Sequence, residues 1–65
     1  MPPRFEIFKI YKNGDVLWLG AADEFQKVIR HALKQPVEPE IRFCLFDQQS
    51  GSVQYYRPDD LLPYA

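Results

Sequence analysis

The chain has 65 residues, of which 46% are hydrophobic and 26% charged, and a formal net charge of −1. This length fits one small domain, residues 1–65, whose own core is marginal because a short chain buries little of its surface. The weak charge excludes a general attraction to polyanions, and the apolar stretches are too short to cross a membrane. One cysteine excludes an internal disulfide and, with no apolar leader at the N-terminus, favours a cytoplasmic location.

The first predicted element is a β-hairpin, with strands over residues 4–12 and 15–21. Asn13-Gly14 between them favours a two-residue type I′ turn, because both residues tolerate positive φ. Side chains alternate along a strand, so this loop length decides which residues share a face. One face then carries Phe8, Ile10, Leu17 and Leu19, and the other carries Ile7, Lys9, Tyr11, Val16 and Trp18.

A helix is predicted over residues 23–35. Asp23 is a candidate N-cap, with Gln26 completing a capping box, and Pro36 ends the segment. Apolar residues recur at helical spacing and form one stripe. The stripe consists of Phe25, Val28, Ile29, Ala32 and Leu33.

A second hairpin is predicted from strands over residues 40–47 and 52–57, joined by a polar turn that ends at Gly51. A loop of two or four residues places Tyr56 with Phe43 and Leu45 on the helix side. The same loop places Cys44, Phe46, Val53 and Tyr55 on the opposite side, whereas a three-residue loop exchanges the two sets. Residues 58–65 follow as a C-terminal tail.

These elements predict an α+β fold with the order ββαββ, in which two β-hairpins form a four-stranded sheet and one helix packs on one face. The strand order 2-1-4-3, which is β-grasp-like, and the order 1-2-3-4 both fit the pattern.

Three motifs carry a resemblance to a group of known proteins. They are the turn Asn13-Gly14-Asp15, the return strand Leu17-Trp18-Leu19-Gly20 and the ending Phe46-Asp47-Gln48-Gln49-Ser50-Gly51. In these motifs the chain resembles short uncharacterised bacterial ββαββ proteins, from about Phe5 to Tyr56. The resemblance implies the fold, but it transfers no functional residue because such proteins have no assigned activity.

The residues that could carry chemistry favour structural roles. His31 lies among cations on the predicted helix, with no orienting partner or cleft, and is expected to be a solvated residue. Cys44 lies in mid-strand, where a cysteine usually behaves as a small hydrophobe. Because no metal, phosphate or nucleophile motif is present, we expect no catalytic residues, no metal and no cofactor, and therefore not an enzyme.

The face opposite the helix is the candidate site. An apolar face left uncovered usually meets a partner, and aromatic residues and arginine dominate such contacts. We expect a protein–protein interaction module, most simply a homodimer, built on this face. Its predicted partner-binding residues are Ile7, Lys9, Tyr11, Val16, Trp18, Arg42, Cys44, Phe46, Val53, Tyr55 and Arg57.

Two alternatives remain for this face. Its aromatic residues and the cations Lys9, Arg42 and Arg57 could bind single-stranded nucleic acid weakly, although the chain lacks the basic surplus that phosphate binding favours. The tail could also fold back and cover the face with Leu61, Leu62 and Tyr64.

Overall fold

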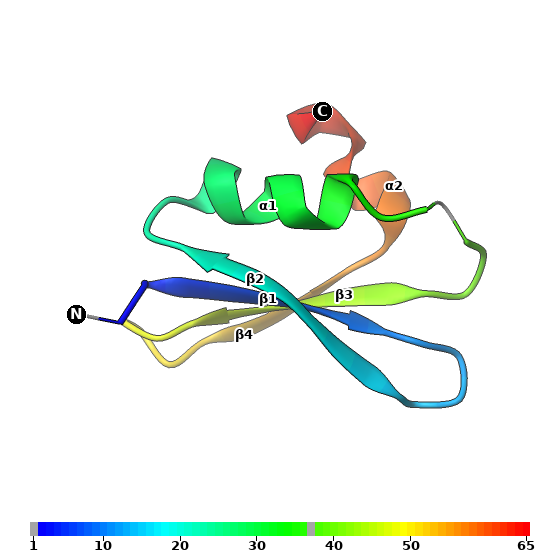
Figure 1. Ribbon diagram of the computed structural model, residues 1–65, viewed down its shortest axis with the longest axis horizontal. Coiled ribbons are helices and arrows are strands. Elements are labelled where there is room, and N and C mark those ends of the chain that lie inside the picture. The colour runs from blue at the N-terminus through cyan, green and yellow to red at the C-terminus, as the bar shows by residue number, and fades with distance from the viewer. Residues whose placement is uncertain (1, 37) are drawn as a thin grey trace.

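The computed structural model describes residues 2–36 and 38–65 and has a sheet with helical elements on one side (Figure 1). The elements are β1 (Phe5–Ile10), β2 (Val16–Ala22), α1 (Phe25–Leu33), β3 (Arg42–Asp47), β4 (Val53–Tyr56), α2 (Pro58–Leu61) and a 3-10 turn, η1 (Leu62–Tyr64). The predicted α+β class and ββαββ order are therefore confirmed. No helix among these residues is long and apolar enough to cross a membrane.

The sheet has the strand order β2-β1-β3-β4, with every neighbouring pair antiparallel. Both predicted orders, 2-1-4-3 and 1-2-3-4, are wrong, and the fold is not β-grasp-like. Since β1 runs antiparallel to both its neighbours, β2 and β3 are parallel and α1 connects them across β1. The two central strands carry the buried Ile7, Phe43 and Leu45, which explains why they occupy the middle of the sheet.

The first hairpin closes with a loop that is one residue longer than predicted. The Tyr11 N–H donates to the Asp15 carbonyl at 2.8 Å, and the Gly14 N–H donates to the Tyr11 carbonyl at 2.9 Å. Gly14 has a φ of +93°, which a residue with a side chain rarely adopts. The loop is thus residues 12–14, a type I turn followed by a glycine bulge, which is the common three-residue alternative to type I′.

This change of register reverses the two faces of β1. Ile7 and Lys9 pair with Leu45 and Phe43 of β3, point toward α1, and are only 0% and 2% exposed. The predicted positions of these residues, and of Phe8 and Ile10 on the helix side, are therefore wrong. The pairing of β1 with β2 shifts a second time, between Ile7 and Phe8 of β1, opposite Leu19 of β2. Because of this second shift, Leu19 still packs against the core as predicted. Leu17 pairs with Lys9 and remains 44% exposed.

The second hairpin has the register that the sequence predicts for a four-residue loop. The Asp47 N–H donates to the Ser52 carbonyl, and Gly51 has a φ of +75°. Phe43 accordingly pairs with Tyr56 on the inner side, and Phe46 pairs with Val53 on the other.

The core lies between the sheet and α1. Val28, Ile29 and Ala32 of α1 are buried, and Phe25 and Leu33 pack against them, so the predicted stripe is confirmed. The core is completed by Ile7, Ile41, Phe43, Leu45 and Leu61. The predicted capping box is wrong. Glu24 is the N-cap without a side-chain bond, and the Asp23 carboxylate instead accepts the Arg4 N–H at 3.3 Å.

The helix meets β2 where a glycine leaves room for it. A Cβ added at Gly20 would lie 2.7 Å from the His31 ring. His31 therefore lies over Gly20 and is half-buried, instead of being fully solvated as the sequence suggested.

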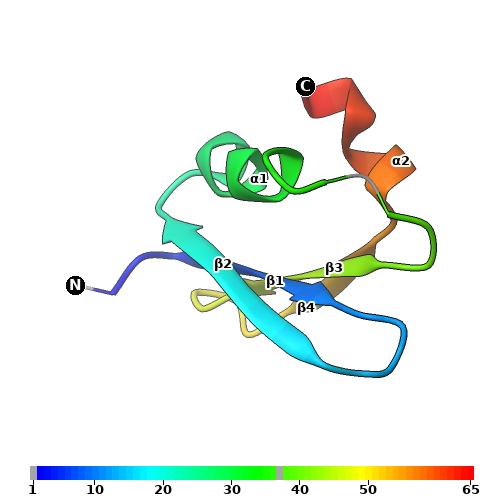
Figure 2. The ribbon, with the colours of Figure 1, turned by 45° about the vertical axis from the view of Figure 1, so that its right-hand side comes forward.

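The C-terminal residues pack on the same side as α1, as two views show (Figures 1 and 2). Leu61 of α2 is 1% exposed within the core. The Tyr64 ring lies edge-on to Phe25, with centroids 5.1 Å apart. The alternative in which the tail covers the opposite face is therefore wrong.

Candidate functional site

The side of the sheet opposite α1, here called the outer face, carries alternate side chains from all four strands. They are Glu6, Phe8, Ile10, Val16, Trp18, Ala21, Arg42, Cys44, Phe46, Val53 and Tyr55. The exposed fraction is 65% for Tyr55, 60% for Val16, 56% for Trp18 and 47% for Val53. The described tail and helices lie on the other side, so the face is open (Figures 1 and 2).

Strand pairing arranges the outer face in three rows that run across the sheet. The middle row contains Trp18, Phe8, Cys44 and Tyr55, in the order of the strands. One flanking row contains Val16, Ile10 and Arg42, and the other contains Ala21, Glu6, Phe46 and Val53. An aromatic centre thus lies between one row with a cation and one row with a carboxylate.

Seven of the predicted partner-binding residues lie on the outer face. They are Val16, Trp18, Arg42, Cys44, Phe46, Val53 and Tyr55. Ile7 and Lys9 lie on the inner side, with Tyr11 beside Lys9. Arg57 follows β4 as the N-cap of α2, and its N–H donates to the Asp60 carboxylate at 2.8 Å.

Phe8 and Ile10 also lie on this face, although the sequence pattern predicted them on the helix side. A signal for them was available, because Lys12-Asn13-Gly14 also fits a three-residue loop with glycine in the last position. That reading alone would have shifted the register by one residue and exchanged the faces of β1.

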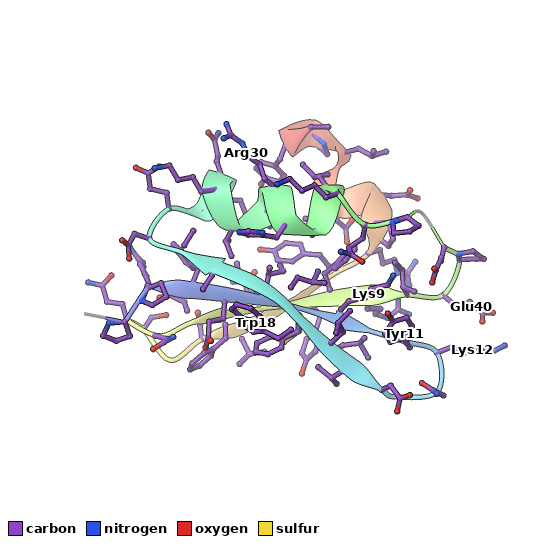
Figure 3. The ribbon with its side chains drawn as sticks, viewed as in Figure 1. Lys9, Tyr11, Lys12, Trp18, Arg30 and Glu40 are labelled. Atoms are coloured by element: carbon purple, nitrogen blue, oxygen red, sulfur yellow. The ribbon has the colours of Figure 1, made fainter. Side chains whose placement is uncertain are left out.

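Lys9 is a buried cation with partners on the inner side, and Figure 3 shows it on the side of the sheet opposite Trp18. Its Nζ lies 3.7 Å from the Glu38 carboxylate and 4.9 Å from the centre of the Tyr11 ring. A buried ammonium needs such partners, since an unpaired charge in the interior is costly. Consequently Arg42 is the single cation among the outer-face residues of the four described strands.

Cys44 occupies the middle row beside Phe8 and Tyr55. Burial raises the pKa of its thiol above the ordinary value. A raised pKa lowers the fraction of nucleophilic thiolate at neutral pH. The environment of Cys44 therefore suits a small apolar side chain better than a reactive one.

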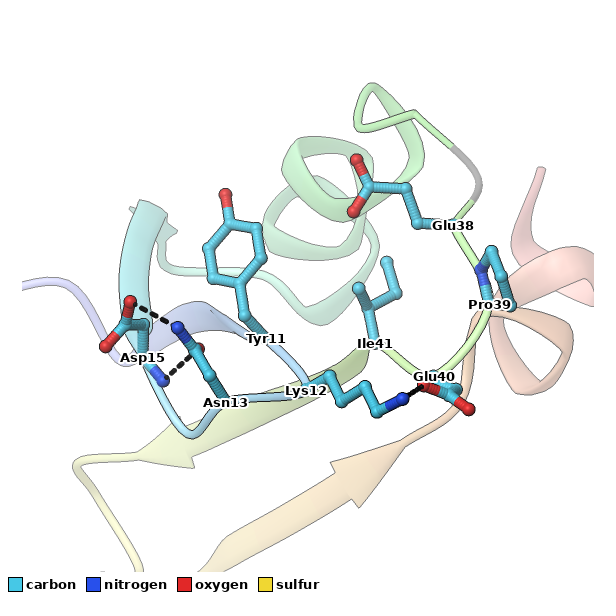
Figure 4. A pocket seen from close by; sticks show the side chains of 8 residues that line it. All are labelled: Tyr11, Lys12, Asn13, Asp15, Glu38, Pro39, Glu40 and Ile41. Carbon is cyan, nitrogen blue, oxygen red and sulfur yellow. Dashed lines mark hydrogen bonds and ion pairs between the residues drawn. The ribbon is translucent and has the colours of Figure 1, made fainter.

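A depression lined by charged and apolar side chains lies where the first hairpin approaches the segment before β3 (Figure 4). Each carboxylate that lines it already has a partner. Asp15 binds Asn13 at 2.9 Å, Glu40 pairs with Lys12 at 3.0 Å, and Glu38 faces Lys9. The Lys12–Glu40 and Lys9–Glu38 pairs join the hairpin to the segment, whereas the Asn13–Asp15 bond lies within the loop.

A second charged group joins the N-terminal segment to the end of β3. Arg4 binds both carboxylate oxygens of Asp47, each at 3.1 Å. This guanidinium, helped by the Gln49 N–H, lowers the pKa of Asp47 to about 2. The pair fixes the strand end and leaves the Asp47 carboxylate fully engaged.

The geometry gathers aromatic and aliphatic side chains on one open surface, with Glu6 and Arg42 at its two ends. The ion pairs Lys9–Glu38, Lys12–Glu40 and Arg4–Asp47 lie outside that surface. In residues 2–36 and 38–65, no three His, Cys, Asp or Glu side chains lie together in a way that could hold a metal ion. Comparisons of the chain with protein-family models, curated proteins and solved structures give no match.

Proposed function

We propose that this protein is a non-catalytic protein–protein interaction module that self-associates as a dimer through its outer face. The observation that carries the proposal is the open middle row, in which Trp18 and Tyr55 are more than half exposed on either side of Phe8. Exposed apolar patches often mark interaction sites, and tryptophan and tyrosine are frequent anchors there.

The small size of the chain supports self-association. A domain of 65 residues has limited core area, and oligomerisation is one of the common ways in which small scaffolds gain stability. Two sheets that pack face to face lie about 10 Å apart and interdigitate their side chains. The outer face of one copy offers the apolar surface that the other copy needs.

The edges of the sheet are less suitable for association. The register of β2 is irregular near Leu19, and β4 has four residues. Bulges and short edge strands are devices that disfavour pairing between sheet edges. The outer face is therefore the better contact.

The expected affinity is modest. Four strands with a spacing of about 4.8 Å and a rise of about 3.3 Å per residue give a face of roughly 20 by 20 Å. That area is at the small end of specific interfaces, so we expect a dissociation constant on the order of micromolar.

Sedimentation velocity between about 1 and 300 µM, on either side of that constant, tests the proposal. We expect the wild type to shift from monomer to dimer with concentration, and Trp18→Glu and Tyr55→Glu to remain monomeric. Leu17→Glu is a matched control. Leu17 precedes Trp18 on β2 and is also exposed, but it points to the inner side of the sheet. Circular dichroism should show that all variants are folded.

A wild type that remains monomeric over this range contradicts the proposal. The alternative function, weak binding of single-stranded nucleic acid, has less support because Lys9 lies on the inner side of the sheet. It is tested with the same protein. Trp18 fluorescence is followed while an oligothymidine is added at low salt, the condition that favours phosphate binding most. A saturable change there would favour the nucleic-acid function over self-association.

A further inference from the structure

We propose, on the basis of the proposed dimer, that the two copies meet with their strand ends reversed, so that Glu6 of each copy pairs with Arg42 of the other. The two residues lie at opposite corners of the central ladder on the outer face. Glu6 pairs with Phe46 at one end of β1, and Arg42 pairs with Ile10 at the other end. The Phe8–Cys44 pair lies midway between them.

A face-to-face dimer with two-fold symmetry can be arranged in two simple ways. If the axis runs across the strands along the middle row, the strand ends are exchanged. The row that contains Glu6 then lies over the row that contains Arg42 in the other copy. Because the symmetry is two-fold, the same contact forms twice.

The other arrangement has its axis along the strands, which leaves the strand ends in place. The row that contains Glu6 then lies over its own equivalent, and so does the row that contains Arg42. Like charges thereby approach each other at both ends of the interface. Such juxtaposition is a common source of discrimination against a wrong arrangement.

The reach of the side chains permits the reversed arrangement. Arg42 of the partner lies one strand, about 5 Å, to the side of Glu6, across a sheet separation of about 10 Å. A long arginine side chain and a glutamate can cover that diagonal. Gln48 Nε2 donates to Oε2 of Glu6 at 3.1 Å, which holds the carboxylate and leaves Oε1 to accept from Arg42 of the partner.

The aromatic row is compatible with this arrangement. An axis along the middle row brings β2 over β2 and β4 over β4 of the other copy. Trp18 then meets Trp18 of the partner, and Tyr55 meets Tyr55. The hydrophobic contact supplies the affinity, while the two charge pairs at its rim select the orientation.

A charge-exchange experiment tests the inference. Glu6→Arg and Arg42→Glu are each measured alone and in an equimolar mixture by sedimentation velocity. Each variant alone places like charges at both ends, and we expect its dimer to weaken about tenfold. In the mixture one copy carries arginine at both positions and the other carries glutamate at both, so opposite charges meet at each end. We therefore expect a heterodimer within about threefold of the wild-type affinity.

Two controls separate charge from folding and from the proposed function. Glu24→Arg changes the net charge by the same amount away from the face, near Lys27 of α1, and should leave the dimer unchanged. The double variant Glu6→Arg with Arg42→Glu in one chain should dimerise like the wild type. With the axis along the strands the wild type already has like charges at both ends, so neither single variant would weaken its dimer. A wild-type dimer that Glu6→Arg and Arg42→Glu leave unweakened therefore overturns the reversed arrangement alone. A wild type that never dimerises overturns the proposed function itself.

Discussion

The two faces of the sheet carry similar apolar side chains but have very different surroundings. On the inner face Ile7, Phe43 and Leu45 are at most 5% exposed beneath α1. On the outer face, Trp18 and Tyr55 are 56% and 65% exposed. The chain therefore has apolar residues for two faces and helical segments for one, and this imbalance locates the surface at which a partner is expected.

The charged residues of the two faces also differ in how they are satisfied. On the inner side Lys9 faces Glu38 within the same chain. On the outer face Glu6 and Arg42 lie at opposite ends of the ladder, too far along the strands to pair with each other. The charge on the inner face thus has a partner within the same chain, whereas the outer face presents two charges that a second copy can pair.

The largest effect is expected from removing the tail's anchor on the inner face. Leu61→Ala should lower the free energy of unfolding by about 2–4 kcal/mol, since it leaves a cavity in a packed core. Its neighbour Leu62 is 62% exposed, so Leu62→Ala should change stability by less than about 0.5 kcal/mol. Urea unfolding at low protein concentration measures both. Equal effects would show that the tail is not part of the core.

The sequence predicted the helix, the four strands and their order along the chain, but both predicted strand orders in the sheet were wrong and the faces of β1 were reversed. The helical stripe was sufficient for α1. The faces of β3 and β4 were predicted correctly because loops of two and four residues give the same faces, and the loop observed has four residues. The faces of β1 depended on the turn, because a loop of two or three residues reverses them. Burying Lys9 runs against the usual preference for exposed lysine, and Glu38, which compensates for it, lies 29 residues away, beyond any local pattern.

The position of the tail could not be predicted for a similar reason. The tail contains three apolar residues close together in the sequence, Leu61, Leu62 and Tyr64. Their pattern does not indicate which face of the sheet they would cover. The short helix α2 begins at Pro58 and turns Leu61 toward α1. That choice depends on three-dimensional packing, and it decides whether the outer face remains open.

A smaller effect is expected where α1 contacts β2. Gly20→Ala should destabilise the protein by about 1–2 kcal/mol, because the new methyl group must displace the His31 ring that lies 2.7 Å away. In a His31→Ala background the same substitution should be neutral or stabilising, since the space is then free. A double-mutant cycle from thermal unfolding measures this coupling. Additive effects would place His31 away from Gly20.

The smallest effect at neutral pH concerns Asp47, at the end of the inner face. Arg4 holds the pKa of Asp47 at about 2, below its ordinary value of 3.8. A lowered pKa stabilises the folded chain above pH 4, and this contribution is lost as the pH falls from about 4 toward 2. We expect Asp47→Asn to flatten the acid limb of the stability curve measured by urea unfolding at each pH. An acid limb identical to that of the wild type would show that the pair is not formed.

The most direct test of the central claim is a search for contacts between copies by NMR. A sample that mixes isotope-labelled and unlabelled protein should show intermolecular NOEs from Trp18, Phe8 and Tyr55, and none from the buried Phe43 and Leu45. Spectra that do not change with concentration, or contacts that arise from α1 and α2 instead, would contradict self-association through the outer face.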